Sequence, residues 1–204
     1  MIGIVFASEA EAAAFVARYG RGRFDGIAEG ESQFDDDILV SIVGVGKIKA
    51  TLRAERLLQE YRLTRIIHMG ACLTLADEPA IGEIIAAEQV FEGDRVELAA
   101  PSYPRMPIDT AFDKLKAYRI VTQDRLVDGA DEVGYWQRLA HVTDTTAYPL
   151  AYVSATHGVP LDIAKVVSGK AGEKRTEAAE VARGYEALAE FVIAALPDIL
   201  SAAG

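Results

Sequence analysis

The chain of 204 residues contains one cysteine, Cys72, and three histidines. A single cysteine cannot form an internal disulfide, and it cannot build a thiolate metal centre alone. The histidines are scattered and lack the short spacing that is typical of metal ligands. The sequence therefore predicts no disulfide framework, no metal and no other cofactor.

Positive charge and long apolar runs are also scarce. The 21 basic residues are outnumbered by 31 acidic ones, so the surface repels nucleic-acid phosphates and anionic lipid head groups. The longest uncharged apolar stretch, 66–76, is far shorter than the roughly 20 residues that span a bilayer. Residues 1–6 lack the basic flank of a secretory signal. We therefore expect a cytoplasmic protein without nucleic-acid or membrane partners.

Hydrophobic residues are abundant, at 50% of the chain. A chain of this length can build one sizeable core but not two comfortable ones. No repeat, low-complexity tract or linker divides the sequence. A single domain over residues 1–204 is predicted.

Apolar runs typical of buried strands alternate with segments of helical period. The acidic turn 35–37 separates two of these runs, which favours a hairpin. Strands are predicted over residues 2–6, 24–31, 38–43, 65–69, 83–90, 118–122, 138–142 and 159–167.

Helices are indicated by helical spacing and by start and stop residues. Ser8 precedes an Ala-rich segment, and Pro197 is expected to end the last helix. The prolines within 94–107 favour an irregular loop there. Helices are predicted over residues 9–19, 47–61, 111–117, 145–157 and 175–196.

Alternating strands and helices, together with a hairpin, predict an α/β protein. The expected architecture is a mixed sheet covered by helices on both faces. In such sheets ligands bind outside the carboxyl ends of the strands. The residues that follow the strands are therefore the candidate site residues.

Five segments at these strand ends form a collinear pattern: Ile2–Glu11 (IGIVFASEAE), Gly44–Lys47 (GVGK), Ile66–Ile85, Asp144–Ala147 (DTTA) and Lys165–Gly169 (KVVSG). In order and spacing they resemble the methylthioadenosine/adenosylhomocysteine nucleosidases of the nucleoside phosphorylase and nucleosidase superfamily, along nearly the whole chain. Each motif alone is common in α/β proteins, so the collinearity carries the resemblance.

The resemblance implies a three-layer α/β/α fold with a central mixed, partly barrel-like sheet. It also implies a small-molecule nucleoside as ligand and a homodimer with the site near its interface. Hydrolysis of an N-ribosidic bond needs a water aimed at the anomeric carbon, a group that holds the ribose and an acid that protonates the leaving purine.

Two carboxylates are the expected catalytic residues. By resemblance, Glu11 stands at the water-positioning glutamate, although Ser8 and Glu11 also form a Ser-x-x-Glu capping box that any helix could use. Thr146 replaces the ribose-holding glutamate, and Asp144 is expected to reach the same hydroxyls. The expected substrate-binding residues are Gly70, Ala71, Cys72, Thr145, Thr146, Lys165 and Ser168.

Lys165 stands where the family has an arginine that pairs with the water-positioning glutamate. A lysine can neutralise a carboxylate but lacks the planar fork of arginine. A solvated lysine near a strand end is the alternative interpretation. The region between Asp94 and Tyr118 is shorter than in the nucleosidases, and its Tyr103, Met106 and Phe112 could line a pocket or simply pack.

Other positions depart from the family pattern. Ala71 replaces a serine, and Leu73 and Thr74 replace paired glycines. Gly169 stands at the position of the acid, and glycine has no side chain that could donate a proton. Ser168 and Lys170 flank it, but neither is a natural acid at neutral pH.

Two hypotheses follow. The first is a divergent nucleosidase that hydrolyses a purine nucleoside or 5′-thionucleoside, and the second is a catalytically silent member that binds nucleosides or proteins. A carboxylate or histidine facing Gly169 would favour the first, with Asp124 and His157 as candidates. Phosphorolysis ranks last, because Phe6-Ala7-Ser8 replaces a phosphate loop and His68 stands where related phosphorylases place an arginine.

Overall fold

The structure is a computed structural model, and it describes residues 1–19, 24–94 and 103–202. Its elements, in chain order, are β1 (Ile2–Phe6), α1 (Glu9–Tyr19), β2 (Ser32–Asp35), β3 (Ile38–Ile42), α2 (Lys47–Glu60), β4 (Arg65–Thr74), β5 (Ile84–Glu92), β6 (Arg105–Pro107), β7 (Ala117–Thr122), α3 (Ala130–Trp136), β8 (Val142–Asp144), α4 (Ala147–His157), β9 (Leu161–Lys170) and α5 (Ala178–Ala202).

In the part of the chain that the structure describes, nine strands form one mixed sheet, and eight of them follow the order β2-β3-β1-β4-β8-β7-β5-β6. Strand β9 pairs with β4 in parallel and with β5 in antiparallel orientation. Because β4, β8, β7 and β5 are themselves paired in series, β9 closes these strands into a barrel. The expected α/β fold with a mixed, partly barrel-like sheet is confirmed.

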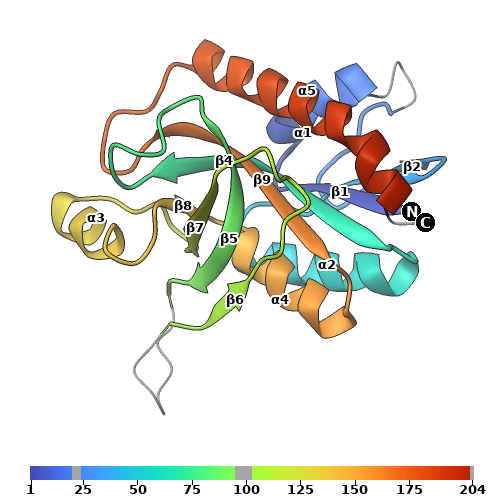
Figure 1. Cartoon of the computed structure of the whole chain (residues 1–204), viewed down its shortest axis with the longest axis horizontal. Coiled ribbons are helices and arrows are strands. Elements are labelled where there is room, and N and C mark those ends of the chain that lie inside the picture. Colours follow the sequence, from blue (N-terminus) through green and yellow to red (C-terminus); the bar gives the residue numbers. More distant parts are fainter. Residues whose placement is uncertain (20–23, 95–102, 203–204) are drawn as a thin grey trace.

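Helices cover both faces of the sheet, as Figure 1 shows. Helices α1 and α5 pack together on one face, and α2 and α4 pack together on the other. Strand β1 is buried on both sides, so its residues divide between the two layers. Ile4 and Phe6 join the core under α1 and α5, whereas Val5 joins the core under α2 and α4.

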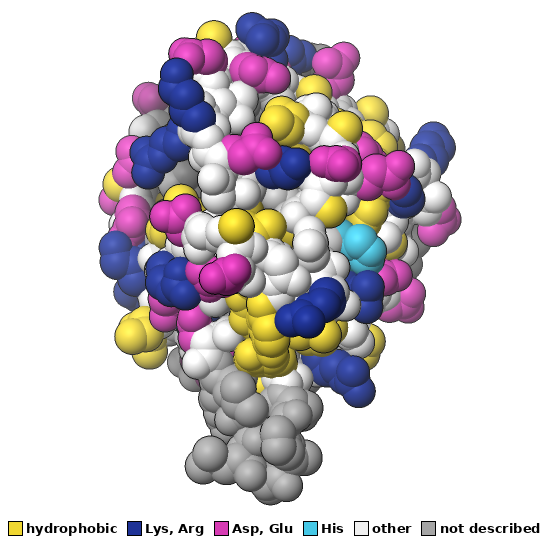
Figure 2. Space-filling view, turned by 90° about the vertical axis from the view of Figure 1, so that its left-hand side faces the viewer, with side chains coloured by type: hydrophobic (Ala, Val, Ile, Leu, Met, Phe, Trp, Pro, Cys, Tyr) yellow, Lys and Arg dark blue, Asp and Glu magenta, His cyan; other side chains and the backbone are white. Residues whose placement is uncertain are grey.

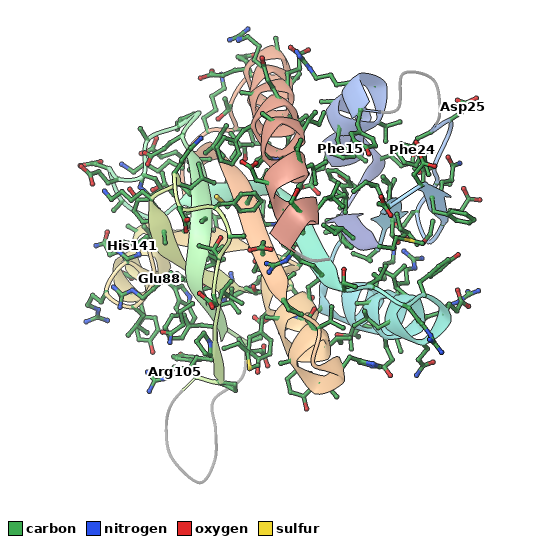
Figure 3. The ribbon with its side chains drawn as sticks, turned by 45° about the vertical axis from the view of Figure 1, so that its right-hand side comes forward. Phe15, Phe24, Asp25, Glu88, Arg105 and His141 are labelled. Atoms are coloured by element: carbon green, nitrogen blue, oxygen red, sulfur yellow. The ribbon has the colours of Figure 1, made fainter. Side chains whose placement is uncertain are left out.

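Aromatic rings close the layer beneath α1. Phe15 of α1 packs against Phe6, with ring centroids 5.7 Å apart. The ring of Tyr19 lies between those of Phe15 and Phe24. Phe15 precedes the undescribed residues 20–23 in the chain and Phe24 follows them (Figure 3). These contacts hold α1, the helix that carries Glu11, against the sheet.

Several sequence predictions of local structure are wrong. Residues 111–116 form bends and a turn and Ala117 begins β7, because the backbone N–H of Ala111 donates to Asp162 and that of Phe112 donates to Thr110. The first hairpin strand is Ser32–Asp35 instead of 24–31. The predicted strand 138–142 begins only at Val142, and helix α3 before it was not predicted.

Helix α5 continues through Pro197, where the sequence predicts its end. A proline removes one backbone hydrogen bond, but it does not forbid helical dihedral angles. Leu196 and Ile199 on either side of the proline are 2% and 5% exposed. Burial of this apolar face against the sheet keeps the chain helical beyond the proline.

Part of the predicted loop 94–107 is also regular, since Arg105–Pro107 forms β6; residues 95–102 lie outside the described part of the chain. Within the described residues, every helix is too short or too polar to cross a bilayer.

Candidate functional site

A pocket of about 820 Å³ lies at the end of the sheet where the parallel strands β1, β4 and β9 finish. Residues of α1, β4, β8, β9 and α5 line it, together with the segments 124–128 and 170–176. Figure 2 looks onto this end of the molecule and shows acidic and basic side chains interspersed over it. The volume is in the range that holds a small organic ligand.

The carboxylate of Glu11 is fixed in the pocket wall by backbone groups. Its Oε2 accepts a hydrogen bond from Ala7 N at 3.0 Å, and its Oε1 accepts one from Ala71 N at 2.9 Å. Only half of the capping box forms, because Glu11 N donates to Ser8 Oγ at 3.3 Å while the carboxylate turns to Ala7 and Ala71. Glu11 thus joins the start of α1 to the end of β4 instead of closing the helix cap.

Gly70 makes room for that carboxylate. A Cβ atom at position 70 would lie 2.6 Å from Glu11 Oε1, closer than real Cβ contacts allow. Gly70 itself does not appear among the pocket residues, whereas its neighbours Ala71 and Cys72 do. Its contribution is therefore space for Glu11 rather than a surface for a ligand.

Asp144, at the end of β8, is the second carboxylate of the wall. Its Oδ1 accepts a hydrogen bond from Thr122 Oγ1 at 2.6 Å, and its Oδ2 accepts one from Ala147 N at 2.9 Å. Lys165 Nζ lies 3.1 Å from Oδ2, and both side chains are at least 98% buried. The ion pair compensates the buried negative charge.

Lys165 therefore has a different partner from the one that the resemblance implies. It pairs with Asp144, and it is buried, which also excludes the solvated interpretation. Its second contact is His68 Nε2 at 2.7 Å. Lys165 lies behind the wall rather than among the pocket residues, so a ligand would meet its charge through Asp144.

His68 completes this buried polar cluster. Its Nδ1 lies 3.0 Å from Val5 O, which can only accept, so Nδ1 is assigned the proton. Its Nε2 is then the acceptor, and it lies 2.7 Å from Lys165 Nζ and 3.0 Å from Thr146 Oγ1. Burial, and then the charge of Lys165, lower the pKa of His68 well below its ordinary value of 6.5. The imidazole is neutral in the folded protein.

The neutral state of His68 makes stability depend on pH. Below about pH 6.5 the unfolded chain binds a proton at His68, whereas the folded chain does not. The free energy of unfolding therefore falls as the pH falls. The slope contributed is up to about 1.4 kcal/mol per pH unit. We expect His68→Gln to remove this contribution to the pH dependence of the free energy of unfolding. Urea unfolding at neutral and at mildly acidic pH would measure it.

His157→Gln is the matched control, because His157 pairs with Glu55 on the surface of α2 and α4. A His68→Gln variant with the same pH slope as the wild type would show that His68 does not carry the effect.

The space beside Gly169 is already filled. A Cβ atom there would lie 2.9 Å from Thr176 Oγ1 and 3.3 Å from Leu73 Cδ2. Lys170 follows on β9 and pairs with Asp77 and Glu173, whose hydrogen bonds raise its pKa. No acidic side chain projects from this part of β9.

The two candidate partners for Gly169 lie in different places. Asp124 lines the pocket, where its Oδ1 accepts a hydrogen bond from Lys47 N at 2.7 Å and caps α2. His157 lies outside the pocket beside Glu55. His141 is also remote, on the same outer region of the barrel as Glu88 (Figure 3).

The structure brings six of the expected site residues to the pocket surface: Glu11, Ala71, Cys72, Asp144, Thr145 and Ser168. Thr146 is buried below it, on His68. Sequence reasoning missed Val45, Thr176 and Tyr185. Val45 lies inside the Gly-x-Gly turn, so that motif could have indicated it, whereas no local signal marks the other two.

Tyr103 and Phe112 pack instead of lining this pocket. Tyr103 lies against Trp136, with ring centroids 4.8 Å apart, and Phe112 against Phe191 at 5.7 Å. Met106 borders a separate, smaller pocket near the start of β4.

With this geometry in place, comparison with known proteins identifies the family. The phosphorylase superfamily matches residues 1–201. The chain belongs to the phosphorylase superfamily. Within it, the 5′-methylthioadenosine/S-adenosylhomocysteine nucleosidase of Shewanella sediminis is 34% identical over 67 residues. That match covers 33% of this chain and only 29% of the relative.

Solved structures of the superfamily share the fold over nearly the whole chain. The futalosine hydrolase mutant of Helicobacter pylori superimposes with a TM-score of 0.85 at 18% identity, covering 97% of this chain and 98% of that one. The 5′-methylthioadenosine/S-adenosylhomocysteine nucleosidase of Helicobacter pylori gives 0.80 at 17% identity, with 97% of each chain covered. The Campylobacter jejuni nucleosidase gives 0.80 at 18%, covering 94% and 96%. At such low identity these superfamily members establish the fold alone.

Proposed function

We propose that this protein is a nucleosidase that hydrolyses the N-ribosidic bond of a purine nucleoside or 5′-thionucleoside. The placement of Glu11 carries the proposal. Two backbone N–H groups hold its carboxylate at the wall of a nucleoside-sized pocket, and each oxygen keeps a lone pair for a water molecule. A carboxylate held in this way can orient a water and accept its proton.

The second carboxylate suits the sugar. Asp144 Oδ1 has one hydrogen bond from Thr122 and capacity for another, so it can accept from a ribose hydroxyl. Thr145 adds a hydroxyl to the pocket surface beside it. In the reaction, the water oxygen bonds to C1′ and the proton of that water passes to Glu11, while the bond from C1′ to the base nitrogen breaks and its electron pair stays on the base, which takes up a proton from solvent. The anionic wall favours the oxocarbenium character of the sugar in that step.

The packing around Gly169 favours a second candidate, a nucleoside-binding protein without activity. Leu73 and Thr176 occupy the space that an acid would need, and Lys165 already neutralises Asp144. A pocket that keeps its shape but has lost its acid would still bind a nucleoside.

A base-release assay separates the two functions. Methylthioadenosine, adenosylhomocysteine, adenosine, inosine and 5′-deoxyadenosine would be incubated with and without phosphate and analysed by HPLC. Phosphate-independent release of free base supports the nucleosidase. No release from any compound at protein concentrations near those of the substrates, combined with nucleoside binding in calorimetry, supports the silent binder.

A homodimer is the assembly that we propose, and the exposed apolar residues of α2 and α4 suggest where it forms. Ile48, Leu52 and Tyr152 are 74%, 66% and 55% exposed, and Val45 beside them is 54% exposed and also lines the pocket. Helices α2 and α4 pack side by side (Figure 1). Exposed apolar residues gathered in this way mark protein interfaces.

Ile48→Glu should convert the dimer to a monomer, because it places a charge in the apolar contact. Light scattering coupled to size exclusion would measure the mass. Ile81→Glu is the matched control, since Ile81 is also exposed, at 46%, but lies in the loop before β5. A wild-type monomer at micromolar concentration, or dissociation by both substitutions, would contradict this interface.

A further inference from the structure

The pocket has a water-positioning carboxylate but no evident donor for the leaving base. At Gly169 the wall is made by a backbone without a side chain, by the Leu73 methyl groups and by the Thr176 hydroxyl. A threonine hydroxyl can donate a hydrogen bond, but it does not release its proton at neutral pH. This part of the wall therefore cannot act as a general acid.

The other ionisable groups on the pocket surface are poorly suited to the task. No histidine lines the pocket within the described residues. Burial, and then the charge of Glu11, raise the pKa of Tyr185 to about 12. Burial also raises the pKa of the Cys72 thiol. Asp144 is held as an ion pair by Lys165.

The carboxylates at the pocket mouth are engaged as acceptors. Asp124 accepts from Lys47 N, Asp128 accepts from Gly129 N at 2.8 Å, and Glu173 pairs with Lys170. All three belong to exposed residues, which water reaches freely. Among the described residues, the pocket has no enclosed group positioned to protonate a base.

We propose, on the basis of the nucleosidase function above, that the substrate is a nucleoside whose base is already cationic, such as a purine alkylated at N7. The bond between C1′ and N9 breaks, and its electron pair neutralises the purinium ring. The base then leaves as a neutral N7-alkylpurine without receiving a proton. The water oxygen bonds to C1′, and the proton of that water passes to Glu11 and then to solvent.

Charge at the site is compatible with such a ligand. The lining has five acidic residues, Glu11, Asp124, Asp128, Asp144 and Glu173, and three basic ones, Lys170, Lys174 and Arg175. The whole chain carries a net charge of −10, which draws cations toward the molecule.

The test compares kcat/KM for N7-methylinosine and inosine with the wild-type protein, after subtraction of spontaneous hydrolysis at neutral pH. We expect kcat/KM for N7-methylinosine to exceed that for inosine by about 100-fold or more. A positioned acid typically raises the rate 10²- to 10⁴-fold, and only inosine, whose leaving base needs a proton, lacks that contribution in this pocket. Cleavage of both compounds at similar rates would overturn this inference and leave the nucleosidase standing. Cleavage of neither would overturn both.

A variant that restores an acid gives a second measurement. Gly169→Asp combined with Thr176→Gly removes the hydroxyl that crowds position 169. We expect the double variant to raise the ratio of inosine turnover to N7-methylinosine turnover by about 10- to 100-fold relative to Thr176→Gly alone. An equal change for both compounds in the folded double variant would contradict the assignment.

Discussion

Replacing Glu11 by glutamine should lower the rate of base release by about 100-fold or more. Glutamine keeps the shape of the side chain and can still accept one of the hydrogen bonds from Ala7 and Ala71. Its amide cannot take a proton from water, and its NH₂ group faces a backbone N–H that it cannot satisfy. The loss would be measured as kcat/KM by HPLC on the best substrate of the nucleoside panel.

Glu9→Gln is the matched control for Glu11→Gln. Glu9 belongs to the same helical turn, but its carboxylate accepts from Glu29 N at 3.2 Å and does not line the pocket. We expect the Glu9→Gln variant to keep an activity close to that of the wild type. If Glu11 served only the helix start, Glu11→Gln would reduce stability and leave turnover per folded molecule unchanged, which would contradict the catalytic assignment.

Most of the main strands could be predicted because short apolar runs are local signals. Ile2–Phe6 is buried on both faces, and its sequence contains no polar residue. The start of α1 was equally clear from Ser8, whereas the role expected for Glu11 came from the resemblance to the nucleosidases. Such features depend on neighbours within a few residues of one another, which the sequence displays directly.

The partner of Lys165 could not be predicted in the same way. Its contacts with Asp144 and His68 arise because β9 pairs with β4 and β5 to close the barrel. A strand register sets which side chains meet, and no local pattern encodes the closure. The resemblance pointed to Glu11 as the partner, and the packing of this chain selects Asp144.

Long-range packing also explains the errors in local structure. Pro197 is a helix-ending signal, but the buried neighbours Leu196 and Ile199 outweigh it. Residues 111–117 have adequate helical propensity, yet the carboxylate of Asp162 on β9 captures the backbone N–H of Ala111. In both places a tertiary contact overrides an intrinsic preference of modest size.

The buried ion pair should be the most sensitive point of the structure. Lys165→Met leaves the carboxylate of Asp144 without its compensating charge at a site where both side chains are almost completely buried. Removing one partner of such a pair costs about 3 to 5 kcal/mol of the free energy of unfolding. Urea unfolding at neutral pH would measure the loss. Lys170→Met, on the same strand but in an exposed ion pair, should change stability little.

A double-mutant cycle distinguishes the lost charge pair from lost packing. Combining Lys165→Met with Asp144→Asn removes both charges, so the double variant should be more stable than Lys165→Met alone. The asparagine can still accept from Thr122, which preserves one of the hydrogen bonds at the end of β8. If Lys165→Met lost no more stability than Lys170→Met, the pair would not stabilise the fold. If the stability losses of Lys165→Met and Asp144→Asn were simply additive, the cost of Lys165→Met would lie in the packing of the lysine methylene chain rather than in the charge left on Asp144.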